Sequence, residues 1–175
     1  MITPEQIITL ANSIGKSPII ACIGSTKTLS DCFGPIVGQL LVDKYKVNAT
    51  VVGTLLTPHH AVNLIPRISE TIKSYPLSKI IAVDAYESKE NKDNIRIQNG
   101  GIKPGLASGK NLPRIGDFSI ISSTFKQNGN VCCLGRIYSL ADKVAKLINF
   151  IVSYGYSKSD SVSQTSTDTI RLLTL

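Results

Sequence analysis

The sequence predicts an α/β fold of three layers, in which a mostly parallel sheet lies between helices. Short apolar runs at residues 19–23 and 79–84 lack the polar alternation of half-exposed strands, and residues 49–54 between them form a further predicted strand. Such runs are typical of parallel strands that are buried on both faces. Segments with helical spacing separate these runs, and strands that alternate with helices imply parallel pairing through right-handed crossovers. The chain has 175 residues, enough to bury one substantial core.

The first third of the chain carries recognisable helix signals. We expect a helix over residues 3–14, with Thr3 as its N-cap and Pro4 at its first helical position. A glycine turn and a hydroxyl-rich loop follow the first strand, and a second helix starts near Asp31. Asp31 is the predicted N-cap of that helix, and Ser30 is a second candidate.

The remaining elements are predicted from apolar spacing and from turn residues. In chain order we expect a helix at 61–74, a polar loop at 87–94, a strand at 94–98, a long glycine-rich loop at 100–113, strands at 118–122 and 131–134, and a helix from 140 to about 155.

Composition predicts one domain and a tail. Residues 1–156 form a single α/β domain in this interpretation, and residues 157–175 form a flexible tail rich in Ser and Thr. Hydrophobic residues make up 42% of the chain and charged residues 18%, which excludes an intrinsically disordered protein. No apolar run approaches the roughly 20 residues of a membrane helix, and the N-terminus lacks the pattern of a signal peptide. We therefore expect a cytoplasmic protein without a membrane partner.

Charge and motifs argue against several function classes. The net charge of +7 would suit a nucleic-acid partner, but the basic residues are scattered from Lys16 to Arg171 without a basic run. The loop after the first strand matches neither a dinucleotide fingerprint nor a P-loop. The four cysteines fit no zinc spacing, and a nucleophilic Cys32 lacks a supporting motif. We expect no cofactor and no bound metal.

Two aspartates fall where chemistry is expected. Asp31 follows the first strand and Asp84 ends the third, and successive parallel strands deliver their carboxyl ends to one edge of a sheet. Two neighbouring carboxyls do not ionise together easily, so one can serve as acid and the other as base against an amide carbonyl. Two alternatives stay open: the pair could chelate a cation, and Asp31 could serve only as a helix cap.

Three more polar residues are candidates for the same site. His60 follows the second strand, and its imidazole could act as acid or base there or could be structural. Asp117 precedes a strand and could be a turn residue or a second contact in the cleft. Ser30 offers a hydroxyl beside Asp31 that could orient the acid. We assign these three residues to substrate binding or to support of the two aspartates.

The motifs together resemble those of a known family. The combination consists of D-x-x-G-P at residues 31–35, H-A-V-N-L at 60–64, A-V-D-A at 82–85 and L-P-x-x-G-D-x-S-I at 112–120. In this order they are similar to sporulation proteins of the YyaC type, which are described as spore proteases. The resemblance runs from about residue 19 to residue 154.

This resemblance implies a phosphorylase/hydrolase-like fold, similar to germination protease and to hydrogenase maturation proteases. The acids of the D-x-L-G-P and I-D-A motifs of germination protease correspond to Asp31 and Asp84. The implied function is a sporulation-associated endopeptidase that cleaves a spore protein through an aspartate pair, in the cytoplasm, forespore or spore interior. The family commonly has acids at the positions of Thr26, Leu56 and Thr57. Their replacement supports an alternative, a catalytically silent relative that binds a spore or developmental protein. The oligomeric state is left open.

Overall fold

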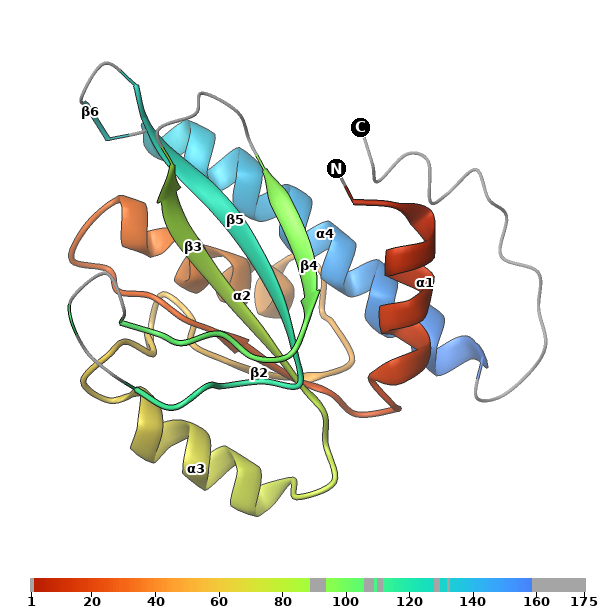
Figure 1. Ribbon diagram of the computed structural model, residues 1–175. Coiled ribbons are helices and arrows are strands. Elements are labelled where there is room, and N and C mark those ends of the chain that lie inside the picture. Colours follow the sequence, from red (N-terminus) through yellow and green to blue (C-terminus); the bar gives the residue numbers. More distant parts are fainter. Residues whose placement is uncertain are drawn as a thin grey trace.

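The protein folds as a three-layer α/β/α sandwich, as predicted (Figure 1). The computed structural model describes residues 2–88, 94–105, 109, 112–127, 130, 131 and 133–158. Five strands follow the order β2-β1-β3-β5-β4, and β6 pairs with β5 outside this path. Helices α1, α2 and α4 lie on one face of the sheet, and α3 lies on the other.

The elements along the chain have the following bounds: α1 Pro4–Ser13, β1 Ile19–Cys22, the 3-10 helix η1 Ser30–Cys32, α2 Phe33–Asp43, β2 Thr50–Val52, α3 Leu64–Ser74, β3 Ile80–Ser88, β4 Ile95–Asn99, β5 Phe118–Gln127, β6 Asn130–Val131 and α4 Leu134–Lys158.

Parallel pairing creates one edge at which functional residues can gather. Strand β1 pairs in parallel with β2 and β3, and β3 pairs in parallel with β5, whereas β4 runs antiparallel to β5. The carboxyl ends of β1, β2 and β3 therefore point the same way. We call this side of the sheet the carboxyl edge; η1 and the loop before α3 follow β1 and β2 there.

Apolar residues divide into two clusters, one on each face of the sheet. The larger cluster joins α1, α2 and α4 to alternate strand residues that include Ile20, Ile81, Val83 and Ile120. The smaller cluster lies under α3, and the intervening strand residues, such as Ala82, contribute to it. Strand residues alternate between the two faces, so this division tells us to which face each neighbouring polar side chain belongs.

Glycines let α2 approach the strands at backbone contact distance. A Cβ atom at Gly34 would meet the carbonyl oxygen of Ile23, and one at Gly38 would meet that of Gly53. Gly24 lies directly after β1 with φ +150°, and a Cβ there would collide with the carbonyl oxygen of Asp31. Only glycine fits at such contacts. The η1 turn is thereby held against the end of β1.

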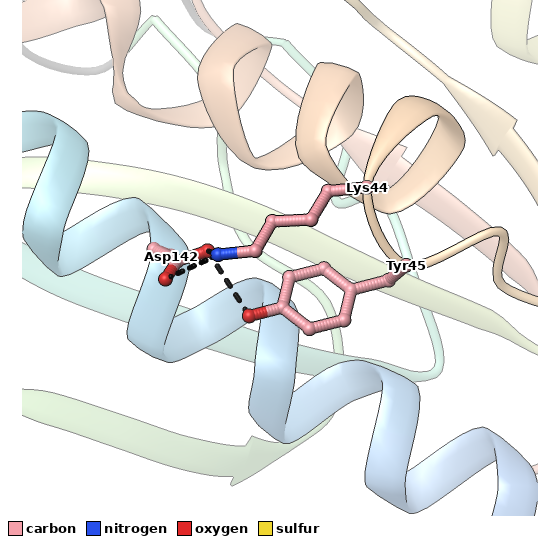
Figure 2. A network of polar contacts seen from close by, with 3 residues as sticks. All are labelled: Lys44, Tyr45 and Asp142. Atoms are coloured by element: carbon pink, nitrogen blue, oxygen red, sulfur yellow. Dashed lines mark hydrogen bonds and ion pairs between the residues drawn. The ribbon is translucent and has the colours of Figure 1, made fainter.

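A polar clasp joins the end of α2 to α4 (Figure 2). The Nζ of Lys44 donates to both carboxylate oxygens of Asp142, at 2.7 and 2.9 Å, and the hydroxyl of Tyr45 donates to Oδ1 at 3.0 Å. The two charged side chains are partly exposed, so water screens this ion pair. The clasp therefore orients α4 more than it stabilises the fold.

Several boundaries differ from the sequence prediction. The capping box between Thr3 and Gln6 confirms the first helix. Strand β3 continues to Ser88 instead of ending at Asp84, because β5 supplies pairing partners as far as Phe125. Helix α4 begins at Leu134, six residues before the predicted start. Most of the predicted tail, residues 159–175, lies outside the described residues.

No helix within the described part of the chain is both long enough and apolar enough to span a membrane.

Substituting Gly34 tests the close approach of α2 and β1. We expect Gly34→Ala to lower the free energy of unfolding by about 2–3 kcal/mol, because the added methyl group meets a backbone carbonyl that cannot move aside. Gly135→Ala is the matched control, since nothing lies within 4 Å of a Cβ in that helix. It should raise stability by about 0.5 kcal/mol through helix propensity alone. Urea unfolding measures both values, and equal effects would contradict the proposed contact.

Candidate functional site

Asp84 is the first residue of β3 beyond the end of its pairing with β1. The last β1–β3 pair is Cys22 with Val83, whereas β3 and β5 still pair at Asp84 and Ile121. Asp84 follows Ala82 by two residues, so its side chain points to the α3 face of the sheet. The residue is partly buried, and its Oδ1 accepts the backbone N–H of Ala85 at 2.8 Å.

Asp31 comes to the same edge on the one-turn helix η1. Its backbone carbonyl accepts the N–H of Ser25 at 3.0 Å, which closes the loop between β1 and η1. Neither η1 nor α2 has a side-chain cap, and Cys32 occupies the N-cap position of α2. The prediction that Asp31 or Ser30 caps this helix is therefore wrong. Because η1 and α2 are continuous, their junction needs no side-chain cap, and the exposed Asp31 carboxyl remains available for other chemistry.

The charge of Asp31 acts on the carboxyl of Asp84. Burial raises the pKa of Asp84 to about 7; the N–H of Ala85 opposes this rise, and the charge of Asp31 adds to it. Burial also raises the pKa of Asp31, against the N–H of Ser25 and the charge of His60. The fold thus brings Asp31, Asp84 and His60 into one electrostatic neighbourhood. Near neutral pH, Asp84 holds a proton for much of the time.

A short loop after β2 presents His60 to Asp31. The N–H of His60 donates to Oδ1 of Asn63 at 2.9 Å, and Nδ2 of Asn63 donates to the carbonyl of Pro58 at 3.1 Å. The N–H of Val62 donates to Nδ1 of His60 at 3.3 Å. In the neutral imidazole, this contact places the proton on Nε2. Nε2 is then the donor that can face a carboxylate.

His59, in contrast, has a structural position. Its carbonyl accepts the N–H of Gly24 at 2.9 Å, and it forms a parallel bridge with Ile23 at the end of β1. The side chain is buried, and burial, with the charges of Arg67 and His60, lowers its pKa. His59 therefore stays neutral near neutral pH and fixes the loop, while the charge of its neighbour His60 acts on Asp31.

Asp117 does not belong to this site. It precedes β5, so parallel pairing places it at the opposite edge of the sheet, where β3 begins. There its carboxylate accepts from Nζ of Lys79 and from the N–H of Ile80, each at 2.9 Å. The expectation that Asp117 lines the cleft with His60 is wrong, because an acid before a parallel strand and an acid at the end of one lie at opposite edges.

The geometry also weakens the cysteine alternative. Burial and the charge of Asp31 both raise the pKa of the Cys32 thiol, which is the opposite of what a thiolate nucleophile needs. The described residues contain no cluster of three or more His, Cys, Asp or Glu side chains that could hold a metal ion.

The sequence interpretation did not identify Asn63 as a functional residue. Its side chain closes the histidine loop through two hydrogen bonds, so it positions His60 indirectly. Asn directly before a helix commonly bonds to nearby backbone groups, and that preference is the signal that could have found it.

The dependence of stability on pH tests the environment of Asp84. An acid whose pKa is raised in the folded state destabilises the fold increasingly as pH rises from about 4 to about 7. Asp84→Asn should therefore stabilise the protein by up to about 4 kcal/mol above pH 7 and have little effect near pH 4. Asp117 is the matched control. Burial alone would raise its pKa, but Lys79 and the N–H of Ile80 lower it, so Asp117→Asn should destabilise at neutral pH. Urea unfolding at several pH values gives the change in the free energy of unfolding for each variant. If both substitutions stabilised the protein at neutral pH, or both destabilised it, this account would be contradicted.

Comparisons with known proteins agree with this architecture. The crystal structure of a [NiFe] hydrogenase maturation protease, HycI from Thermococcus kodakarensis KOD1, superposes with a TM-score of 0.55. It covers 86% of this chain and 99% of its own, at 15% sequence identity, which shows a shared fold.

The sequence resemblance is also confirmed. The uncharacterized protein YyaC of Bacillus subtilis (strain 168) is 34% identical over 113 residues, which are 64% of this chain. The match spans only 55% of that relative's own length. The family described as "Protein of unknown function (DUF1256)" matches residues 3–148. Because this match covers most of the sequence, the chain belongs to the DUF1256 family.

Proposed function

We propose that this protein hydrolyses peptide bonds, with Asp84 as the acid and Asp31 as the base. One observation carries the proposal: two carboxyls share one sheet edge, and their environments differ. Asp84 is partly buried with a pKa of about 7, whereas Asp31 is exposed and lies near a histidine. Amide hydrolysis by a carboxyl pair uses one protonated and one ionised acid.

The proposed reaction uses both states. Protonated Asp84 donates a hydrogen bond to the carbonyl oxygen of the scissile bond, while ionised Asp31 removes a proton from water. The water oxygen attacks the carbonyl carbon, and the proton of Asp84 passes to the carbonyl oxygen. When the C–N bond breaks, Asp31 gives its proton to the leaving nitrogen and Asp84 recovers its own.

Neighbouring groups support these assignments. His60 favours the ionised form of Asp31, and so does the N–H of Ser25. The N–H of Ala85 holds Oδ1 of Asp84, which leaves Oδ2 to carry the proton toward a substrate. In this proposal His60 and Ala85 position the two acids and do not react themselves. Ser30 has a supporting place beside Asp31 on η1.

For the substrate we propose a protein of the spore. The resemblance to sporulation proteins and the similarity to YyaC of Bacillus subtilis support this choice. The fold shared with a hydrogenase maturation protease fits a peptidase. The alternative, a relative that binds its spore partner without cleaving it, predicts intact partner in the same assay.

Substitution of each acid tests the mechanism. We expect Asp31→Asn and Asp84→Asn each to lower kcat/KM for peptide cleavage by at least about a thousandfold, because each removes one half of the proton transfer. The assay incubates the protein with a spore-protein extract and identifies new peptide termini by mass spectrometry.

Asp117→Asn is the control, since Asp117 lies at the opposite edge of the sheet. It should retain cleavage at a temperature where it is folded. Fragments that persist in the Asp31 or Asp84 variant would overturn the mechanism. Specific co-purification of an uncut protein would support the binding alternative.

The pH profile supplies an independent check. Cleavage needs Asp84 protonated, so kcat/KM should fall as pH rises through about 7. It also needs Asp31 ionised, so activity should fall on the acid side as that carboxyl takes up a proton. We expect a bell-shaped profile of kcat/KM, measured with a peptide whose own groups do not titrate. Constant activity from about pH 6 to about pH 9 would contradict the acid role of Asp84.

A further inference from the structure

The sheet face that carries Asp84 continues past the acid pair onto β5 and β4. Asp84 and Ile121 occupy equivalent positions on β3 and β5, and Arg96 of β4 is opposite Ile121. Asp84, Ile121 and Arg96 thus form one row across three strands. The neighbouring row of Val83, Ile120 and Ile97 packs into the core with α2 and α4, so the Asp84 row points to the other face.

Solvent reaches this row. Arg96 is exposed, and Asp84, Tyr86 and Ile121 are partly exposed. In Figure 1, α3 lies well below the upper parts of β3, β5 and β4, and α2 and α4 are behind them. Among the described residues, this face therefore continues from Asp84 to Arg96 and is accessible to solvent.

Arg96 is held over this face by an aromatic ring. The guanidinium carbon of Arg96 lies 5.4 Å from the ring centroid of Tyr86, a cation–π contact that spans β5. Tyr86 is two residues after Asp84 on the same side of β3. The contact draws the cation across β5 toward β3, the strand that carries Asp84. Within the described residues, the guanidinium forms no ion pair with a carboxylate.

We propose that Arg96, positioned by Tyr86, binds a carboxylate of the peptide substrate. The inference rests on the proposed function, because it extends that site by a specificity contact. Arginine presents paired N–H donors that match a carboxylate, and stacking on a ring leaves those donors free at the edge of the guanidinium. The net charge of +7 also favours an acidic peptide over a basic one.

Strand spacing sets where this carboxylate lies in the substrate. Asp84 and Arg96 are two strands apart, or about 10 Å between Cα atoms. An extended peptide advances about 3.3 Å per residue. The carboxylate therefore belongs to a residue about three positions from the scissile bond. It is either an Asp or Glu side chain or the C-terminal carboxylate of the peptide.

A binding titration tests the inference without requiring cleavage. The probes are three capped tripeptides: Ala-Glu-Ala amide, Ala-Gln-Ala amide, and Ala-Gln-Ala with a free C-terminal carboxylate. Each is titrated into isotope-labelled full-length protein at low salt, and the side-chain N–H signal of Arg96 is followed by NMR. We expect Ala-Glu-Ala amide or the free acid to bind at least about tenfold more tightly than the neutral amide. The probe that binds identifies the source of the carboxylate.

Variants separate a specific site from general attraction. Arg96→Gln should abolish the preference for a carboxylate, and Tyr86→Phe, which keeps the ring, should retain it. Lys73→Gln removes one positive charge from the last turn of α3 and should have no effect. The same spectra report whether each variant is folded. Equal binding of the three probes, or a preference that survives Arg96→Gln, would overturn the proposal. A carboxylate preference in a protein that cleaves no spore peptide would reject the proposed function and leave the carboxylate site standing.

Discussion

The contact between α2 and the end of β1 is the constraint on which the site depends. Gly24 and Gly34 let the η1–α2 segment lie against the backbone of the strand, at distances that any side chain would prevent. This contact sets the position of Asp31 relative to β3. The acid therefore belongs to the sheet edge rather than to a free loop, and its charge reaches Asp84. A larger residue at either glycine would separate the two carboxyls as well as destabilise the fold.

The unequal lengths of β1 and β3 determine the state of Asp84. Strand β3 continues beyond its last pair with β1. Asp84 is therefore paired with β5 on one side and lies just past the end of β1 on the other. Pairing with β5 removes water from part of the carboxyl, and the N–H of Ala85 stabilises its charged form only in part. The raised pKa follows from this position. A strand that ended at Asp84 would leave the acid in solvent with a more ordinary pKa.

The two edges of the sheet have different roles. At the carboxyl edge, the partly buried Asp84 and the exposed Asp31 lie near His60, and among the described residues the carboxyl of Asp84 accepts the N–H of Ala85. At the opposite edge, Asp117 is neutralised by Lys79 and by the N–H of Ile80, which suits an acid that stabilises the fold. Arg96 extends the polar surface of the carboxyl edge across the open face of β5 and β4. The proposed acid pair and the proposed carboxylate contact thus share one surface of the sheet.

Local pattern in the sequence was enough to determine the layer architecture and the N-cap at Thr3, because apolar periodicity and helix-start signals are encoded residue by residue. The same pattern did not fix the direction of the strand after Asp117, and only its parallel pairing with β3 places Asp117 at the opposite edge of the sheet. It also could not show that Asp31 leaves α2 uncapped, or that β3 runs on to Ser88. These features depend on which strands pair and where each pairing stops. Long-range register decides that, and only the tertiary structure contains it.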